Sequence, residues 1–384
     1  MKYICEKNLC TGCCACENVC LRQAISMTID ERGFIFPNID SDKCVDCGLC
    51  KSVCPILSKI QLHTPIVAYR GSIDGVYLHN STSGGVFPAL AKQVIDNNGC
   101  VVGAFLNESF EVKHIIINKL EDIKLLQGSK YVGSNLSEIY KRIKEIINND
   151  ITVLFTGTPC QVAGLKNYLN LCNVGEKISN LFTCDFICHG VGSQKIFDKF
   201  LSYEQVINGS KIIDVKFRSK IKRYSNSCMV LSFADGSKKI YPSYRNAFGY
   251  AFSIGMINRL SCSKCKFAQI NRVSDVTFAD CIHGLSRKEK KDGCSYIIVN
   301  SIKGALEINK LRSNLDEISL ESIVSVQPHL SRPQKAHNLR EKIMNDIDKD
   351  FVYLYKNYLI PPKRNILKSL KERIRYAIKK THNC

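Results

Sequence analysis

Eight cysteines near the start of the chain fall into two copies of one spacing. The copies are Cys10-x2-Cys13-x2-Cys16-x3-Cys20 and Cys44-x2-Cys47-x2-Cys50-x3-Cys54, and Pro55 follows the second. Thiolates at this spacing hold [4Fe-4S] cubanes in bacterial two-cluster modules. The sequence therefore predicts two [4Fe-4S] clusters within residues 1–57, and with them one-electron transfer.

Each cluster is expected to take ligands from both copies, because the fourth cysteine of a run binds the other cluster. One cluster is assigned to Cys10, Cys13, Cys16 and Cys54, and the other to Cys44, Cys47, Cys50 and Cys20. A disulfide framework fits less well, since such frameworks belong to small secreted chains and no secretory signal is read at the start of these 384 residues. Zinc sites show pairs of cysteines rather than two runs of four.

Composition narrows the class of protein. Hydrophobic residues make up 45% of the chain, enough to fill a core in two or three domains. No stretch of eighteen apolar residues indicates a membrane span. Twenty-one cysteines without a secretory signal indicate a reducing compartment, so we expect a cytoplasmic protein.

Positive charge is concentrated at the end of the chain. The formal net charge is +19, yet residues 1–62 carry seven basic and seven acidic residues, whereas residues 351–384 carry nine basic residues and one acidic residue. In a helix, apolar residues four apart would form one stripe among these cations: Ile366, Leu370, Ile374 and Ile378. This pattern is typical of a peripheral membrane helix, or of a basic surface helix docked on its own domain or a second subunit. Nucleic-acid binding is not expected, because no aromatic-plus-basic module accompanies the charge.

Four further cysteines follow apolar runs in the middle of the chain. Cys160 lies where a strand over 151–155 turns into a helix, Cys188 follows a second apolar stretch, and Cys262 and Cys265 form a Cys-x2-Cys pair. Ligand sites in α/β sheets lie at the carboxyl ends of strands. These four thiols are a candidate set for a third cluster, and buried cysteines acting as small hydrophobes are the alternative.

Hydrophobic periodicity predicts alternating strands and helices from residue 66 onward. Strands are expected at 66–69, 99–105, 112–117, 151–155, 181–184, 212–217, 229–233 and 295–299, and helices at 86–95, 136–147 and 161–169. The expected fold is of the α+β class. It has a two-cluster ferredoxin domain at 1–57, a mixed α/β flavin-binding domain at 66–335 and a basic helical tail at 336–384.

Several short strings together resemble one family. In chain order they are Ser83-Gly84-Gly85-Val86-Phe87, Gly128-Ser129-Lys130-Tyr131-Val132, Gly157-Thr158-Pro159-Cys160-Gln161, Cys188-His189-Gly190-Val191, Phe217-Arg218-Ser219-Lys220 and Cys262-x2-Cys265. Over residues 66–335 the chain is similar to the coenzyme F420 hydrogenase/dehydrogenase beta-subunit family. A bacterial subgroup with the same ferredoxin fusion is associated with exopolysaccharide genes.

The resemblance implies FAD and a [4Fe-4S] cluster in the α/β domain. Small residues at a helix start also suit a phosphate group. Expected cofactor contacts are Ser83, Gly84, Gly85, Ser129, Lys130, Tyr131, Thr156, Gly157 and Thr158. Lys130 and His189 are the candidate catalytic groups, and the alternative for His189 is a hydrogen bond that supports Cys188.

The chain departs from the family pattern after residue 278. The family continues there with Gly-Asp-Phe-Trp-Gly, whereas this chain has Ala279-Asp280-Cys281-Ile282-His283-Gly284 and no tryptophan anywhere. Substrate identity therefore does not transfer from the family. Cys281 also becomes a competitor for a place among the third set of ligands.

Three functions follow from these observations. The first is an iron–sulfur flavoprotein oxidoreductase that passes electrons between [4Fe-4S] clusters and an FAD-mediated hydride donor or acceptor, either F420-like or of another kind. Its partner would be a redox protein or a small hydride carrier. The second is a non-catalytic electron-transfer subunit that docks on a partner enzyme. The third is a redox-type protein of exopolysaccharide biosynthesis.

Overall fold

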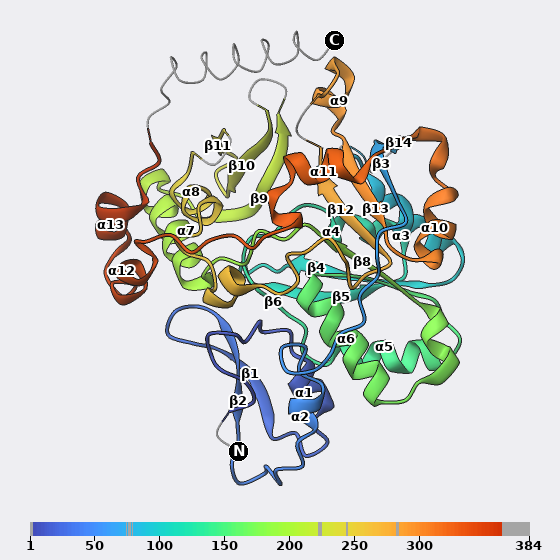
Figure 1. The fold of residues 1–384 in the computed structure, drawn as a ribbon. Coiled ribbons are helices and arrows are strands. Elements are labelled where there is room, and N and C mark those ends of the chain that lie inside the picture. The colour runs from blue at the N-terminus through green and yellow to red at the C-terminus, as the bar shows by residue number, and fades with distance from the viewer. Residues whose placement is uncertain are drawn as a thin grey trace.

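The computed structural model describes residues 3–362 except 74, 76, 77, 79, 222–224, 243, 244, 282 and 283. A small N-terminal part lies at one end of a larger α/β part, and the two are in contact (Figure 1). The predicted apolar stripe at 366–378 lies outside the described residues. Within the described part of the chain, no helix is long and apolar enough to cross a membrane.

The N-terminal part is built from two short helices and one hairpin. Its elements are α1 (Ala15–Val19), β1 (Ile25–Ile29), β2 (Ile35–Ile39) and α2 (Leu49–Ser52). β1 and β2 pair antiparallel, with Ile25 opposite Ile39. α1 and α2 lie against each other, and each directly follows a cysteine-rich loop.

A nine-stranded mixed sheet forms the centre of the larger part, in the order β14-β3-β13-β12-β8-β7-β4-β5-β6. Strands β4, β7, β8 and β12 are parallel, and β13 pairs antiparallel with both β12 and β3. The strands are β3 (Val67–Gly71), β4 (Cys100–Leu106), β5 (Val112–Ile117), β6 (Ser134–Asn135), β7 (Val153–Thr156), β8 (Leu181–Phe186), β12 (Val276–Asp280), β13 (Ser295–Val299) and β14 (Leu315–Ile318).

Side chains of the central strands alternate between two core clusters, because successive residues of a strand point to opposite faces. Val101 and Leu154 pack toward α3 (Val86–Asp96) and α10 (Ile302–Asn309). Val102 and Phe155 pack toward α5 (Ile139–Asn148) and α6 (Pro159–Leu171). Helices therefore cover both faces, which explains the continuous apolar runs of the central strands.

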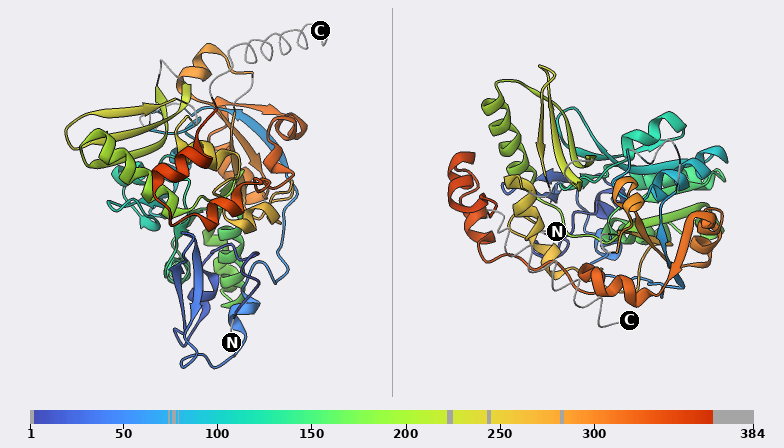
Figure 2. Two further views of the ribbon diagram at one scale, coloured as in Figure 1. Left: turned by 90° about the vertical axis from the view of Figure 1, so that its left-hand side faces the viewer. Right: turned by 90° about the horizontal axis from the view of Figure 1, so that it is seen from above.

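A second, three-stranded sheet has its own core. Its antiparallel strands are β9 (Ile212–Ile221), β10 (Ser225–Phe233) and β11 (Lys238–Tyr241). Apolar side chains of this sheet pack against α7 (Gln194–Asn208), α8 (Ala247–Ser253), α12 (Arg340–Asn345) and α13 (Phe351–Leu354). The two sheets lie on either side of the central loops when the molecule is seen from above (Figure 2). The remaining helices are α4 (Ile123–Leu126), α9 (Arg287–Asp292) and α11 (Leu320–Val326).

The predicted mixture of a ferredoxin-like module and an α/β domain is confirmed. The strands expected at 112–117 and 295–299 have those bounds in the structure. The helix expected to start at 136 begins at Ile139 instead, because Ser137 has a positive φ that an α-helix does not allow. Residues 340–359 contribute Ile343, Phe351 and Leu359 to the core.

Candidate functional site

A cavity of about 370 Å³ opens at the carboxyl ends of the parallel strands. The loops after β7 and β8 and the end of β12 form much of its wall. Thr11 and Gly12 from the first cysteine loop complete the wall. The cavity has the size and the position at the sheet expected of a cofactor site.

The four scattered cysteines all line this cavity. Cys160 lies in the first turn of α6, Cys188 follows β8, and Cys262 and Cys265 belong to a 3₁₀ turn at Leu260–Lys264 and its end. Thr158 Oγ1 lies 3.1 Å from Cys160 Sγ, and the Gly190 N–H donates to Cys188 Sγ at 3.3 Å. The fold therefore brings three separate segments to one place.

Burial and mutual repulsion oppose ionisation of these thiols. Burial raises the pKa of Cys160 to about 12, and the nearby Cys265 and Cys262 contribute to the shift. Burial also raises the pKa of Cys262 to about 11, with Cys265 adding to the effect. The pKa of Cys188 is raised for the same two reasons. A bound cation would offset both costs, since metals bind the thiolate form.

Four thiolates are the ligand number of a [4Fe-4S] cluster and also of a structural zinc site. In the described part of the chain, no three His, Cys, Asp or Glu side chains converge closely enough to hold one metal ion. A cubane keeps its thiolates further apart, because its own iron and sulfide atoms lie between them. Four half-buried thiols match the donor set of a [4Fe-4S] cluster in type and number.

The thiols of the N-terminal part form two groups. Cys10, Cys13, Cys16 and Cys54 line one small cavity, together with Cys5 and Cys14. In the other group, burial raises the pKa of Cys50 and the charges of Cys47 and Cys20 add to the shift, so these three are neighbours. The structure thus brings Cys54 to the first loop and Cys20 to the second, as the crossed ligand assignment requires. Cys47 is solvent-exposed.

The first N-terminal group lies beside the larger cavity. A Cβ added at Gly164 of α6 would come within 3.1 Å of Cys13 Sγ, so glycine permits this close packing of α6 on the first loop. The Tyr140 hydroxyl lies 2.9 Å from the Cys13 carbonyl oxygen and 2.8 Å from the Gln161 carbonyl oxygen. Thr11 is also near enough to Cys160 to lower the pKa of its thiol, which partly offsets the effect of burial.

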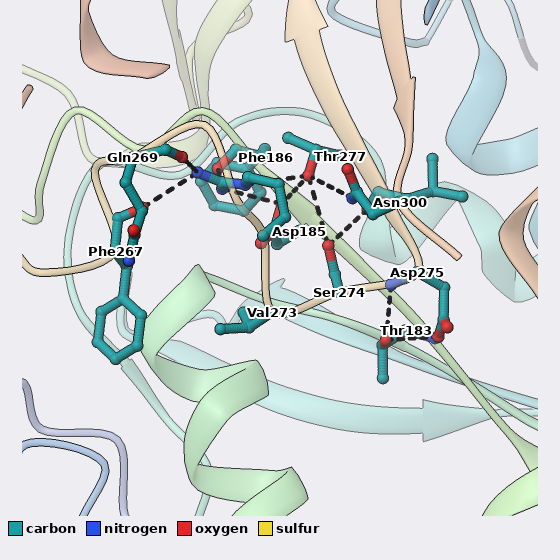
Figure 3. A network of polar contacts seen from close by, with 12 residues as sticks. Thr183, Asp185, Phe186, Phe267, Gln269, Val273, Ser274, Asp275, Thr277 and Asn300 are labelled. Atoms are coloured by element: carbon teal, nitrogen blue, oxygen red, sulfur yellow. Dashed lines mark hydrogen bonds and ion pairs between the residues drawn. The ribbon is translucent and has the colours of Figure 1, made fainter. Parts of the chain in front are cut away.

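A buried polar network fixes the Cys265 loop to the sheet (Figure 3). Arg272 and Asp185 are 2% and 0% exposed in their side chains, and Arg272 Nη2 lies 3.0 Å from Asp185 Oδ1. Arg272 also donates to the carbonyl oxygens of Phe267 at 3.1 Å and Gln269 at 3.2 Å. Thr277 Oγ1 donates to Asp185 at 2.6 Å. The loop that carries Cys265 is therefore tied to the ends of β8 and β12.

The three residues predicted to contact a phosphate, Ser83, Gly84 and Gly85, do not all face the cavity. Ser83 and Gly85 line the cavity, whereas Gly84 packs against β13 and its N–H donates to Ser295 Oγ at 2.9 Å. Ser83 hydrogen-bonds to Asp280. Gly85 is the N-cap of α3. The N-terminus of α3 thus faces the cavity through Ser83 and Gly85.

Lys130 is buried against backbone oxygens at the cavity wall. Its Nζ donates to the carbonyl oxygens of Ala104 at 2.8 Å, Gln127 at 3.0 Å and Leu126 at 3.1 Å. Burial lowers the pKa of Lys130 to about 7. The amine therefore fastens the loop that carries Ser129 and Tyr131, two residues that also line the cavity.

The other predicted contacts share this wall. Thr156, Gly157 and Thr158 line the cavity, and the Thr158 N–H is held by Gln161 Oε1 at 2.9 Å. His189 lines it too, with its ring centroid 4.4 Å from that of His329. Burial lowers the pKa of His189 to about 4, and His329 contributes to the shift, so its imidazole is neutral at pH 7.

Two parts of the chain match known protein families. Residues 150–324 match the family described as the C terminus of the coenzyme F420 hydrogenase/dehydrogenase beta subunit, and residues 9–57 match the 4Fe-4S dicluster domain. Over residues 150–324 the chain is therefore similar to the F420 hydrogenase/dehydrogenase beta-subunit family. Its dicluster domain makes it an iron–sulfur protein.

Two curated relatives are distant. The F subunit of the F420H2 dehydrogenase of Methanosarcina mazei is 23% identical over 231 residues, which cover 55% of this chain and 62% of the relative. The coenzyme F420-dependent sulfite reductase of Methanocaldococcus jannaschii is 27% identical over 175 residues, which cover 43% and 26%. This chain therefore spans less than two thirds of the length of either relative. A solved F420-reducing [NiFe] hydrogenase complex of Methanosarcina barkeri aligns at 15% identity with a TM-score of 0.47, over 78% of this chain and 94% of that one.

The cavity also has residues whose role the sequence did not indicate. Arg218 pairs with Asp280, and burial opposes ionisation of Asp280 while Arg218 and Ser83 stabilise its carboxylate and lower its pKa. His114 Nδ1 lies 2.6 Å from Ser134 Oγ, and His114 Nε2 lies 3.0 Å from the Thr156 carbonyl oxygen. Cys281 lies in a separate core cluster with Cys294 and does not line the cavity.

Proposed function

We propose that this protein is an iron–sulfur flavoprotein oxidoreductase that exchanges electrons between [4Fe-4S] clusters and a hydride donor or acceptor. The observation that carries the proposal is the shared cavity. It is lined by the four scattered cysteines, by all the expected flavin contacts except Gly84 and by the first ferredoxin loop. A one-electron carrier and a two-electron site would therefore meet at one wall.

The cluster ligands in this cavity would be Cys160, Cys188, Cys262 and Cys265. Together with the two groups in the N-terminal part, they would give three [4Fe-4S] clusters per chain. The group around Cys13 is the nearer of the two to the cavity, and the group that contains the exposed Cys47 would exchange electrons at the surface. The clusters would then carry electrons between the cavity and a redox protein docked at the surface.

Flavin contacts would come from the loop that holds Ser83, from Ser129 and Tyr131, and from residues 156–158. A bound flavin would supply exchange of either one or two electrons, which cubanes alone do not provide. The N-terminus of α3 favours an anion such as a phosphate. Lys130 keeps the Ser129 loop in place, and the Arg218–Asp280 pair fixes Ser83 at the helix start.

The hydride carrier is proposed to be a deazaflavin of the F420 type, since both curated relatives are named for F420. His189 is the residue we propose for proton movement, because its imidazole lines the cavity beside the proposed Cys188 ligand. Its position on the cavity wall supports this role.

The composition of the purified protein tests this proposal. Full-length protein isolated without oxygen should contain about twelve irons, from three cubanes, and one flavin per chain. The Cys160→Ser variant should lose about four of these irons. About eight irons and no flavin in the wild type would overturn the enzyme proposal.

A second candidate function is a non-catalytic electron-transfer subunit of a larger complex. Exposed apolar residues next to the cysteine runs favour it: Leu21, which follows Cys20, is 86% exposed, and Val45, between Cys44 and Cys47, is 61% exposed. Apolar residues at such a position suit a protein partner. The same composition test separates the two functions, because only the enzyme requires flavin.

A further inference from the structure

Arg259 is a buried cation that spans the boundary between the two parts of the molecule. It is 4% exposed, and its head group lies among residues of the N-terminal part. Nε donates to the Cys10 carbonyl oxygen at 2.7 Å, and Nη2 donates to the Ile35 carbonyl oxygen at 2.8 Å. The guanidinium carbon lies 4.0 Å from the centroid of the Phe36 ring. All three contacts are made across the domain boundary.

The backbone of Arg259 belongs to the cavity instead. Its N–H donates to the Val191 carbonyl oxygen at 2.9 Å, in the loop that carries Cys188. Cys262 follows three residues later, and Arg259 itself lines the cavity. One residue thus joins the Cys10 loop to two segments of the proposed third ligand set.

The first cysteine loop is shaped around the guanidinium. Gly12 has φ +68°, and a Cβ built there would come within 3.0 Å of Arg259 Nη1 and 2.9 Å of the Ile35 carbonyl oxygen. A side chain at this position would therefore displace the arginine. Gly12 lies between Cys10 and Cys13 in the first cysteine run, so the guanidinium packs directly against this loop.

Arg259 lacks the counter-charge that a buried cation requires. No ion pair between Arg259 and a carboxylate is found among the residues that the structure describes. Burying a charge is unfavourable unless it is paired, and carbonyl oxygens and an aromatic face neutralise it only in part. A cubane held by four thiolates is an anion, and its reduction adds a further negative charge. A cluster on either side of Arg259 would supply the missing charge.

We propose that Arg259 is a positioning residue that acts as the shared counter-cation of two clusters, one held by the Cys10 group and one by the Cys160 group. Its charge stabilises the reduced, more negative form of each cluster and so raises the reduction potential. Its contacts also fix the separation between the two sites. The second of the two clusters rests on the function proposed above, whereas the first depends only on the dicluster domain.

Potentiometry with detection of the reduced clusters by EPR tests this role in the full-length, anaerobically reconstituted protein. Arg259→Gln should shift the one-electron reduction equilibrium of at least one cluster tenfold or more toward the oxidised form, which is about 59 mV. Arg259→Lys keeps the charge and loses the planar contacts, so its potentials should stay near those of the wild type. Arg32→Gln is the matched control, because it removes a different contact across the boundary, the 3.3 Å ion pair with Glu341.

Unchanged potentials in Arg259→Gln, at wild-type iron content, would overturn the inference. If Arg259→Gln does not fold, the Arg259→Lys variant tests the inference instead. A tenfold shift of its reduction equilibrium toward the oxidised form would show that the positive charge does not set the potential. About eight irons in the wild type would remove the third cluster but leave the effect on the Cys10 cluster measurable. About twelve irons with no shift would refute only the role of Arg259.

Discussion

The two cysteine-rich regions of this protein assemble their sites in different ways. In the N-terminal part, eight thiols come from two loops, each within eleven residues of sequence. Around the cavity, four thiols come from three segments between residues 160 and 265, which are the first turn of α6, the loop after β8 and one 3₁₀ turn. The first region needs only local loops, whereas the second exists only when the whole sheet has folded. The cavity site should therefore be lost first when the fold is weakened.

Removing one cavity thiol should have the largest effect, because it should remove iron from the cavity site and leave the N-terminal part unchanged. Cys160→Ser is expected to lose about four irons and the electron exchange of the cavity, while the eight irons of the N-terminal part remain. Iron analysis and the visible spectrum measure this. Cys228→Ser is the control, because Cys228 is buried away from the cavity, in the second sheet. Full iron content in Cys160→Ser would show that Cys160 is not a ligand.

Breaking the Arg272–Asp185 pair should weaken the cavity region next most strongly. Arg272→Met leaves Asp185 buried without its cation, which typically costs about 3–5 kcal/mol of unfolding free energy. Denaturant unfolding measures the change. The control is Arg312→Met, whose partner Glu317 is exposed, where about 0–1 kcal/mol is expected. Equal losses in the two variants would contradict the structural role of this network.

Tyr140 joins the two regions, and its hydroxyl should contribute less unfolding free energy than the Arg272–Asp185 pair. Tyr140→Phe removes the donor shared by the Cys13 and Gln161 carbonyl oxygens and should cost about 1–3 kcal/mol. Tyr353→Phe, at an exposed hydroxyl, should cost little. Limited proteolysis between the two parts should speed up only in the first variant. An unchanged cleavage rate would mean that Tyr140 does not hold the parts together.

The smallest expected effect is a pH dependence at His114. Burial lowers the pKa of this imidazole to about 4, so the unfolded chain binds more protons than the folded one between about pH 4 and 6.5. Stability is fully present above pH 6.5 and is lost as the pH falls. Relative to His114→Gln, the wild type should lose at most about 1.4 kcal/mol per pH unit in this window. Parallel stability curves from pH 7 to 5 would contradict the burial of a neutral His114.

The same contrast explains how much the sequence could predict. Local patterns are sufficient for the eight cysteines and for strands such as Val112–Ile117, because spacing and periodicity are properties of adjacent residues. The helix Gln194–Asn208 was not predicted, although its Ser193 N-cap and Gly209 C-cap are ordinary signals. Arg259 could not be found in this way, since its contact with Cys10 joins residues 249 positions apart. Cavity residues such as His114 likewise cannot be identified from the sequence, because only the packing of the loops brings them to the cavity.

The number of electrons that one chain accepts tests the central claim most directly. In a reductive titration without oxygen, with a strong photochemical reductant, the account predicts about five electrons per chain: one for each of three cubanes and two for one flavin. Cys160→Ser should accept about one electron fewer. Uptake of about two electrons by the wild type, unchanged in the variant, would contradict the account and leave a protein that carries only the two clusters of its N-terminal part.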